Sequence, residues 1–199
     1  METEYTPRQM DWSKIIQQAG EIAGAVNRVE DPVVSDDDVA DRIDYIAKQG
    51  YIPNAQTPDI VRAFLQGYGV MLSGPAGTGK TFLMRCMIGN GRIQHAQRDI
   101  ADWGLDQIYD WFEWRDKKTV CIDDLGAERT ASRYGERDEI MRLVIERRAS
   151  KRDVRTHVTT NLTGEQIRER YGDRILDRLM GMCKVFKMVG ASRREASPI

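Results

Sequence analysis

Histidine and cysteine are scarce in this sequence, and it contains no long apolar run. Among 199 residues there are two histidines and three cysteines, and Cys86, Cys121 and Cys183 lie far apart between apolar neighbours. We expect the cysteines to be small buried side chains, so neither disulfides nor a zinc site is indicated. No run reaches the roughly 18 apolar residues of a membrane span. The first residues, METEYTPRQMDW, also lack the pattern of a signal peptide. We therefore expect a cytoplasmic protein with no membrane partner.

The composition is that of a folded domain with an uneven charge distribution. Hydrophobic residues make up 41% and charged residues 31% of the chain, with a formal net charge of −1. Residues 30–44 are rich in acidic residues, whereas residues 142–155 hold six basic residues against two acidic ones, and residues 184–194 are basic as well. Such a distribution permits contact with nucleic acid but does not require it, because most charge runs are solvated faces.

The first 66 residues carry helical patterns and no catalytic motif. Apolar residues recur with helical spacing over residues 11–30, a capping box at Ser35 and Asp38 opens a second helix that Gly50 ends, and Thr57 with its following proline opens a third. We expect residues 1–66 to form a short N-terminal helical extension. These helices either cover the core of the next domain or dock a partner, and the sequence leaves both interpretations open.

From residue 67 to residue 199 the pattern becomes that of an α/β domain. Strands are expected at 70–73, near 96–100, at 119–123, 156–160 and 184–189, and helices at 79–89, 104–115, 135–150 and 163–171. Strands that alternate with helices predict a parallel sheet flanked by helices on both faces.

The segment GPAGTGKT follows the first of these strands and opens a helix. This is the G-x-x-x-x-G-K-[ST] pattern of a P-loop in its required strand–loop–helix context. Lys80 is expected to reach the outer phosphates of ATP, and the Thr81 hydroxyl to bind Mg²⁺. Leu83, Met87 and Phe82 are expected to face inward from the helix. The expected nucleotide-binding residues are Gly74, Pro75, Ala76, Gly77, Thr78, Gly79, Lys80, Thr81 and Phe82.

Polar side chains end the strands at 119–123 and 156–160. Asp123 and Asp124 follow a hydrophobic strand, where Asp123 would hold Mg²⁺ and Asp124 would orient or deprotonate the attacking water. Asn161 follows the next strand and could hydrogen-bond the water or the γ-phosphate. A solvated pair of carboxylates and a turn-capping asparagine are the alternatives.

Five segments, in order, carry a resemblance to a known family: GPAGTGKTFL, CIDDLGAE, HVTTNLT, ERYGDRILDRL and GASRRE. Over residues 68–194 the chain resembles the AAA+ core of bacterial helicase loaders of the DnaC type, a pattern shared by IstB-type transposition ATPases. The resemblance makes Lys80 and Thr81 the Walker A pair, Asp123 and Asp124 the Walker B pair, and Asn161 the sensor 1 residue. It also implies that the C-terminal lid domain of many AAA+ proteins is not present in full.

Arginines late in the chain take their expected roles from the same resemblance. Arg174 and Arg178 fall on the arginine motif that supplies a catalytic finger to a neighbouring subunit, and Arg193 falls near the late arginine that acts as a sensor 2. An ordinary surface ladder at i and i+4 with Asp173 and Asp177 is the alternative for the first two arginines.

The resemblance implies an ATP-dependent helicase loader in DNA replication initiation. It would bind ATP, Mg²⁺ and single-stranded DNA, deliver a replicative helicase, and self-associate through shared ATP sites. An IstB-like ATPase that regulates a transposase on double-stranded DNA and a nucleotide-dependent adaptor with little turnover remain alternatives. Basic residues at 147–155 could bind DNA, and aromatic residues at 103–114 either stack on bases or pack in the core.

Overall fold

The computed structural model describes residues 32–101, 118–128, 136–151, 154–190 and 192. The chain divides into two compact units, residues 1–32 and 33–199. The helices expected at 11–30 and 104–115, the aromatic segment 103–114 and Arg193 lie outside the described residues. The account that follows concerns the unit that begins at Val33.

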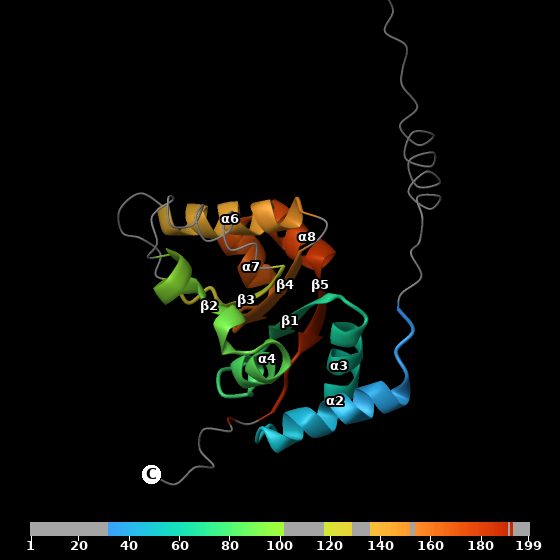
Figure 1. Ribbon diagram of the computed structural model, residues 1–199. Coiled ribbons are helices and arrows are strands. Elements are labelled where there is room, and N and C mark those ends of the chain that lie inside the picture. Colours follow the sequence, from blue (N-terminus) through green and yellow to red (C-terminus); the bar gives the residue numbers. More distant parts are fainter. Residues whose placement is uncertain (1–31, 102–117, 129–135, 152–153, 191, 193–199) are drawn as a thin grey trace, which may run out of the picture. The chain divides into compact units, whose positions relative to one another are not determined.

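The centre of this unit is a five-stranded parallel sheet (Figure 1). The strands lie in the order β2-β3-β4-β1-β5. Their bounds are β1 Gly69–Ser73, β2 Ile93–His95, β3 Thr119–Leu125, β4 Arg155–Thr160 and β5 Cys183–Lys187. Because β4 lies between β1 and β3, the carboxyl ends of these three strands are neighbours. The expectation of an α/β fold with a parallel sheet is confirmed.

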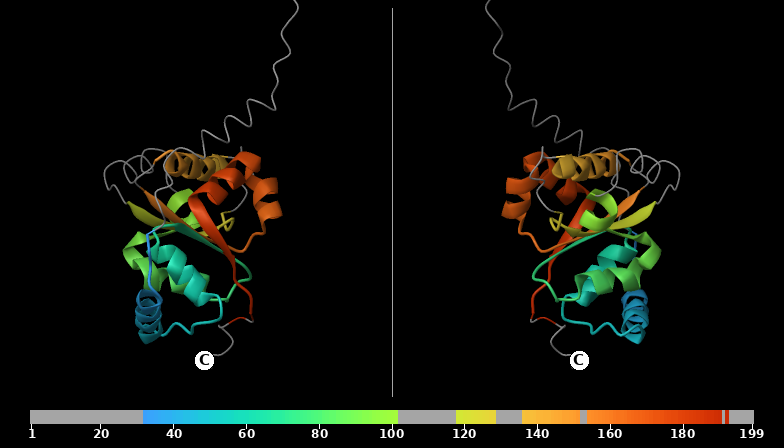
Figure 2. Two further views of the ribbon diagram at one scale, coloured as in Figure 1. Left: turned by 90° about the vertical axis from the view of Figure 1, so that its right-hand side faces the viewer. Right: turned by 90° about the vertical axis from the view of Figure 1, so that its left-hand side faces the viewer.

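Helices cover both faces of the sheet (Figure 2). One face carries α2 Asp36–Lys48, α3 Thr57–Leu65 and α4 Lys80–Ile88; the other carries α6 Glu136–Ala149, α7 Gly164–Tyr171 and α8 Asp173–Met182. A short 3₁₀ turn, η1 Asn90–Arg92, precedes β2. Within the described residues, no helix combines the length and apolar character needed to cross a bilayer.

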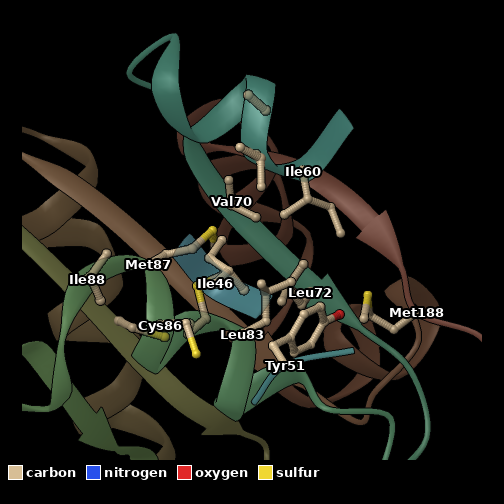
Figure 3. Packing of buried hydrophobic residues seen from close by; sticks show 14 of the residues in the cluster. Ile46, Tyr51, Ile60, Val70, Leu72, Leu83, Cys86, Met87, Ile88 and Met188 are labelled. Atoms are coloured by element: carbon tan, nitrogen blue, oxygen red, sulfur yellow. The ribbon is translucent and has the colours of Figure 1, made fainter. Parts of the chain in front are cut away.

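The helices α2 and α3 pack into the core next to β1 and α4. The capping box predicted at Ser35 is present, with its hydroxyl accepting from the Asp38 N–H at 3.1 Å. Figure 3 shows the buried cluster that joins these elements; it includes Ile46, Ile60, Val70, Leu72 and Leu83. Residues 33–66, which the sequence groups with the N-terminal extension, thus share a core with the sheet. A boundary between two domains at 66/67 stays a prediction.

The strand expected near residues 96–100 is not formed. The strand is β2 at 93–95, and a π-helical turn, η2 Ala96–Ala101, follows it. Ala96 and Ile100 are both buried, at the i and i+4 spacing of a helical face. The Asp99 carboxylate accepts the His95 backbone N–H at 2.8 Å, which supports the turn and ends the strand. The prediction of a strand at residues 96–100 is therefore wrong, because this segment is helical.

Candidate nucleotide site

A cavity of about 740 Å³ opens at the carboxyl ends of β1, β3 and β4. Its size lies within the range of small-molecule sites. The P-loop, the ends of β2, β3 and β4, and the connection between α2 and α3 all contribute to its walls. Of the residues predicted from the sequence, the structure brings Lys80, Thr81, Asp123, Asp124 and Asn161 to this cavity.

The Lys80 ammonium group is held by oxygen atoms of its own loop and of Asn161. Its Nζ donates to the carbonyl oxygens of Gly74 and Pro75, both at 2.7 Å, and to Oδ1 of Asn161 at 2.8 Å. Thr78 Oγ1 donates to the same Pro75 carbonyl at 3.0 Å. Lys80 is 5% exposed, so these neutral acceptors replace much of the water around its charge. An anionic phosphate would compete with them for the ammonium.

Two hydroxyl groups converge on one carboxylate oxygen of Asp123. Thr81 Oγ1 donates to Asp123 Oδ1 at 2.8 Å, and Thr159 Oγ1 donates to the same oxygen at 2.7 Å. A carboxylate and a hydroxyl are hard oxygen donors of the type that Mg²⁺ prefers, and each is anchored at the end of a buried element. Thr81 and Asp123 therefore fit a magnesium site. Thr159, to which no sequence motif assigns a role, orients Asp123 through this hydrogen bond.

A bulge at the end of β3 brings Asp124 to the same cavity as Asp123. Side chains alternate between the faces of a strand, so adjacent aspartates would point to opposite faces. The β3–β4 register shifts between Ile122 and Leu125, and Asp124 has φ 57°. The Asp124 N–H donates to Thr159 Oγ1 at 2.9 Å, which fixes this conformation. A bulge that redirects a side chain next to a site is a recognised device.

Asp124 faces an amide and an imidazole. Asn161 Nδ2 donates to Asp124 Oδ1 at 3.3 Å, while Asn161 Oδ1 accepts from Lys80, so the asparagine bridges the two charged groups. His95 Nε2 lies 3.7 Å from Asp124 Oδ2. The Arg98 N–H donates to His95 Nδ1 at 3.3 Å, which directs the proton of the neutral ring to Nε2. His95 was not predicted; its place at the end of the strand beside β3 is the signal that could have found it.

The wall of the cavity away from the carboxylates is largely apolar. Tyr51 and Ile52 come from the α2–α3 connection, and the Tyr51 and Phe82 rings are stacked with centroids 6.3 Å apart. Phe82 is 41% exposed, whereas Leu83 and Met87 are buried as predicted. The expectation that Phe82 faces inward is wrong, because its ring forms part of the cavity wall. Sequence reasoning missed Tyr51 and Ile52, which no local motif marks.

The two arginines of α8 do not line this cavity. Arg174 Nε forms an ion pair with Glu146 at 2.9 Å, and its side chain is 71% exposed. Arg178 is exposed and forms no ion pair or side-chain hydrogen bond within the part of the chain that the structure describes. At the other end of the site, a Cβ on Gly77 would lie 2.1 Å from Ser192 Oγ. Ser192 thus lies against the P-loop.

A parallel sheet with a P-loop after β1 and paired aspartates at the end of β3, the second strand along the sheet from β1, has the P-loop NTPase fold. Among solved structures, the chain is similar to the crystal structure of the DnaC helicase loader. The TM-score is 0.52 and the sequence identity 17%, over 75% of this chain and 99% of that chain. No protein-family model matches the sequence, and no curated protein matches it. At this identity the similarity establishes the fold.

Proposed function

We propose that the chain is an ATPase of the helicase-loader type. It binds ATP with Mg²⁺, hydrolyses ATP to ADP and phosphate in sites shared between subunits, and uses the nucleotide state to control its hold on single-stranded DNA and a replicative helicase. The observation that carries the proposal is the convergence of Lys80, Asp123, Asp124 and Asn161 on one cavity from three different segments: the P-loop, the end of β3 and the end of β4. The similarity in fold to the DnaC helicase loader supports it.

The side chains of the cavity divide the work of phosphoryl transfer. Lys80 exchanges its loop carbonyl acceptors for the outer phosphates, and Thr81 and Asp123 hold the metal ion. When bound, Mg²⁺ neutralises negative charge on the phosphates. Asp124 accepts the proton of the attacking water, and Asn161 orients that water from the adjacent strand end. The apolar wall of Tyr51, Ile52 and Phe82 suits the nucleotide base.

The arginines of α8 complete the site of a neighbouring subunit. A guanidinium group stabilises the negative charge that develops on the γ-phosphate. Arg174 and Arg178 both lie outside the cavity of their own subunit, so they can act in the cavity of another. Arg178 is the residue to test first, because Arg174 is already paired with Glu146. Hydrolysis would then depend on assembly of the subunits.

The test is complementation between two inactive variants in the presence of single-stranded DNA. Asp124→Asn inactivates the subunit's own ATP site. The double variant Arg174→Ala/Arg178→Ala keeps that site but removes the arginines that the subunit supplies to its neighbour. ATP hydrolysis that returns on mixing supports shared sites. A mixture of Asp124→Asn with Lys80→Ala is the control, since both defects lie on the same side of the interface and cannot complement each other. Wild-type activity with a silent first mixture would contradict the proposal.

A nucleotide-dependent adaptor with little turnover is the second candidate. The position of both α8 arginines outside the cavity favours it, because an isolated subunit then lacks these groups for hydrolysis. The amplitude of a single turnover, compared with the steady-state rate, separates the two candidates. An adaptor gives one turnover per site with and without DNA, whereas the ATPase continues once DNA assembles the subunits.

A further inference from the structure

A second cavity, of about 240 Å³, opens at the opposite end of the sheet from the nucleotide site. It lies where β1 and β4 begin, next to the carboxyl ends of α6 and α8. Gly67 and Gly181 contribute backbone to its walls, and Lys151 and Arg155 contribute positive charge. Because β1 has 5 residues, the two ends of the sheet are about 16 Å apart. A nucleotide bound at the P-loop therefore does not fill this cavity.

Arg155, which lines the cavity, and Lys184, which packs on the lining residue Tyr68, both contact neutral groups. Arg155 Nη1 donates to the Phe64 carbonyl at 3.4 Å, and its guanidinium lies 5.8 Å from the centre of the Phe64 ring. Lys184 lies 3.6 Å from the centre of the Tyr68 ring and donates to Gln66 Oε1 at 3.4 Å. No ion pair joins Arg155, Lys151 or Lys184 to a carboxylate within the described residues.

The pKa values of Arg155 and His157 are both lowered at this end of the sheet. Burial lowers the pKa of Arg155, as expected for a guanidinium taken from water without a counter-charge. His157, on the same strand, is 0% exposed. Its burial, together with the positive charges of Arg155 and Arg148, lowers the pKa of His157 to about 3. A positive charge that is partly desolvated and lacks a carboxylate partner is stabilised when an anion arrives.

The distribution of the charges favours an extended anion over a compact one. Lys118 directly precedes β3, Lys151 lies shortly before β4, Arg155 is the first residue of β4, and Lys184 is the second residue of β5. Cationic side chains therefore occur near the amino ends of three strands of the sheet. A single phosphate ion would engage part of this row. A polymer of phosphodiesters can engage all of it, and its affinity rises with each phosphate contacted.

We infer that the row of Lys118, Lys151, Arg155 and Lys184 is a binding site for the phosphate backbone of a nucleic acid. The choice of single-stranded DNA as the probe rests on the proposed function; the site itself rests on the charge and shape of this end of the sheet. Arg148 forms the floor of the cavity, where its Nε donates to Thr156 Oγ1 at 2.8 Å. It supports the site without facing the ligand.

The test measures the anisotropy of fluorescein-labelled oligothymidylate as the full chain is added, in EDTA without nucleotide. The variant is Lys151→Ala/Lys184→Ala. Its matched control, Lys48→Ala/Lys187→Ala, removes the same charge from exposed lysines elsewhere. We expect roughly tenfold weaker binding for the variant and a fall of about 1.4 in the slope of log K against log salt, since each lost single-strand contact accounts for about 0.7. The control should bind like wild type.

Each other outcome overturns the inference. An equal loss of DNA affinity in the variant and the control would show that only the net charge of the protein matters. Unchanged affinity in both would show that the nucleic acid binds at another place. Inorganic phosphate that displaces the oligonucleotide at equal phosphate concentration would show a site for free phosphate. Binding of a fluorescent ADP analogue, measured in parallel, reports the nucleotide site alone. Failure of the DNA site and failure of the proposed ATPase are therefore distinguishable.

Discussion

Lys80 and Asn161 are joined by a hydrogen bond of 2.8 Å from Nζ to Oδ1, which links the P-loop to the end of β4. The same amide donates to Asp124. Asn161 therefore contacts both Lys80, which would bind the phosphates, and Asp124, which would bind the attacking water. Its loss should affect the chemical step more than binding.

The first prediction concerns Asn161→Ala. We expect kcat for ATP hydrolysis to fall by about 10², with KM changed less than about threefold, because an oriented polar group contributes most in the transition state. Asn90→Ala, an exposed asparagine in η1, is the control and should behave like wild type. Steady-state kinetics with DNA present give both constants. A rise in KM with kcat unchanged would place Asn161 in ground-state binding instead.

The second prediction concerns the turn that follows Asp124. Gly126 has φ 96°, and a Cβ there would lie 2.4 Å from Leu162 Cδ1. Gly126→Ala should lower the free energy of unfolding by about 3 kcal/mol, from the left-handed backbone and the steric overlap together. Gly89→Ala isolates the first effect, since Gly89 has φ 80° with nothing within 4 Å. It should lose about 1–2 kcal/mol. Equal losses in urea titrations would contradict the role of Leu162.

The central part of the site could be predicted from sequence because its signals are local. Lys80 and Thr81 follow a glycine-rich loop of fixed spacing, and Asp123 ends a strand of continuous apolar residues. Each of these residues is placed by its own segment and by the rule that parallel strands meet their ligands at the carboxyl edge.

The remainder of the site depends on contacts between segments far apart in the sequence. The left-handed conformation of Asp124 depends on a hydrogen bond from β3 to Thr159 of β4, and no pattern within residues 119–126 indicates it. The strand that carries His95 has 3 residues, too few to show periodicity. Tyr51 reaches the cavity only because α2 and α3 pack on β1 and α4.

The third prediction concerns Glu128, a carboxylate that is 1% exposed behind the Asp124 turn. It accepts hydrogen bonds from the Tyr171 hydroxyl and, at 2.9 Å, from the Gly126 N–H, and lies 3.5 Å from Arg170 Nη2. Glu128→Ala leaves Arg170 without this partner in a largely buried site. We expect it to lower the free energy of unfolding by about 3–5 kcal/mol in urea titrations.

Two further variants define what Glu128 does. Glu128→Gln can keep the bond from the Gly126 N–H, so its loss of stability should be smaller than that of the alanine variant. Glu169→Ala, at an exposed position of α7, should stay within about 0.5 kcal/mol of wild type. If the three variants were equally stable, the buried contacts of Glu128 would not contribute to the fold.

The fourth prediction is a dependence of stability on pH that arises from His157. Its Nδ1 accepts the Val70 N–H at 3.1 Å, and its pKa is lowered from 6.5 to about 3 by burial and by two nearby arginines. Between these values the unfolded chain binds a proton that the folded chain does not. The stability is therefore complete above pH 6.5 and falls as the pH is lowered toward 3.

This dependence can be measured without interference from the carboxylates whose pKa is lowered. Asp38 and Asp99 contribute stability that is lost only below their ordinary value of 3.8. Between pH 7 and pH 5 we expect the free energy of unfolding to fall by about 2 kcal/mol, at about 1.4 kcal/mol per pH unit below 6.5. His157→Gln keeps an acceptor for the Val70 N–H but cannot titrate, so its stability should be nearly level over this interval. An equal fall in wild type and variant would assign the effect to another group.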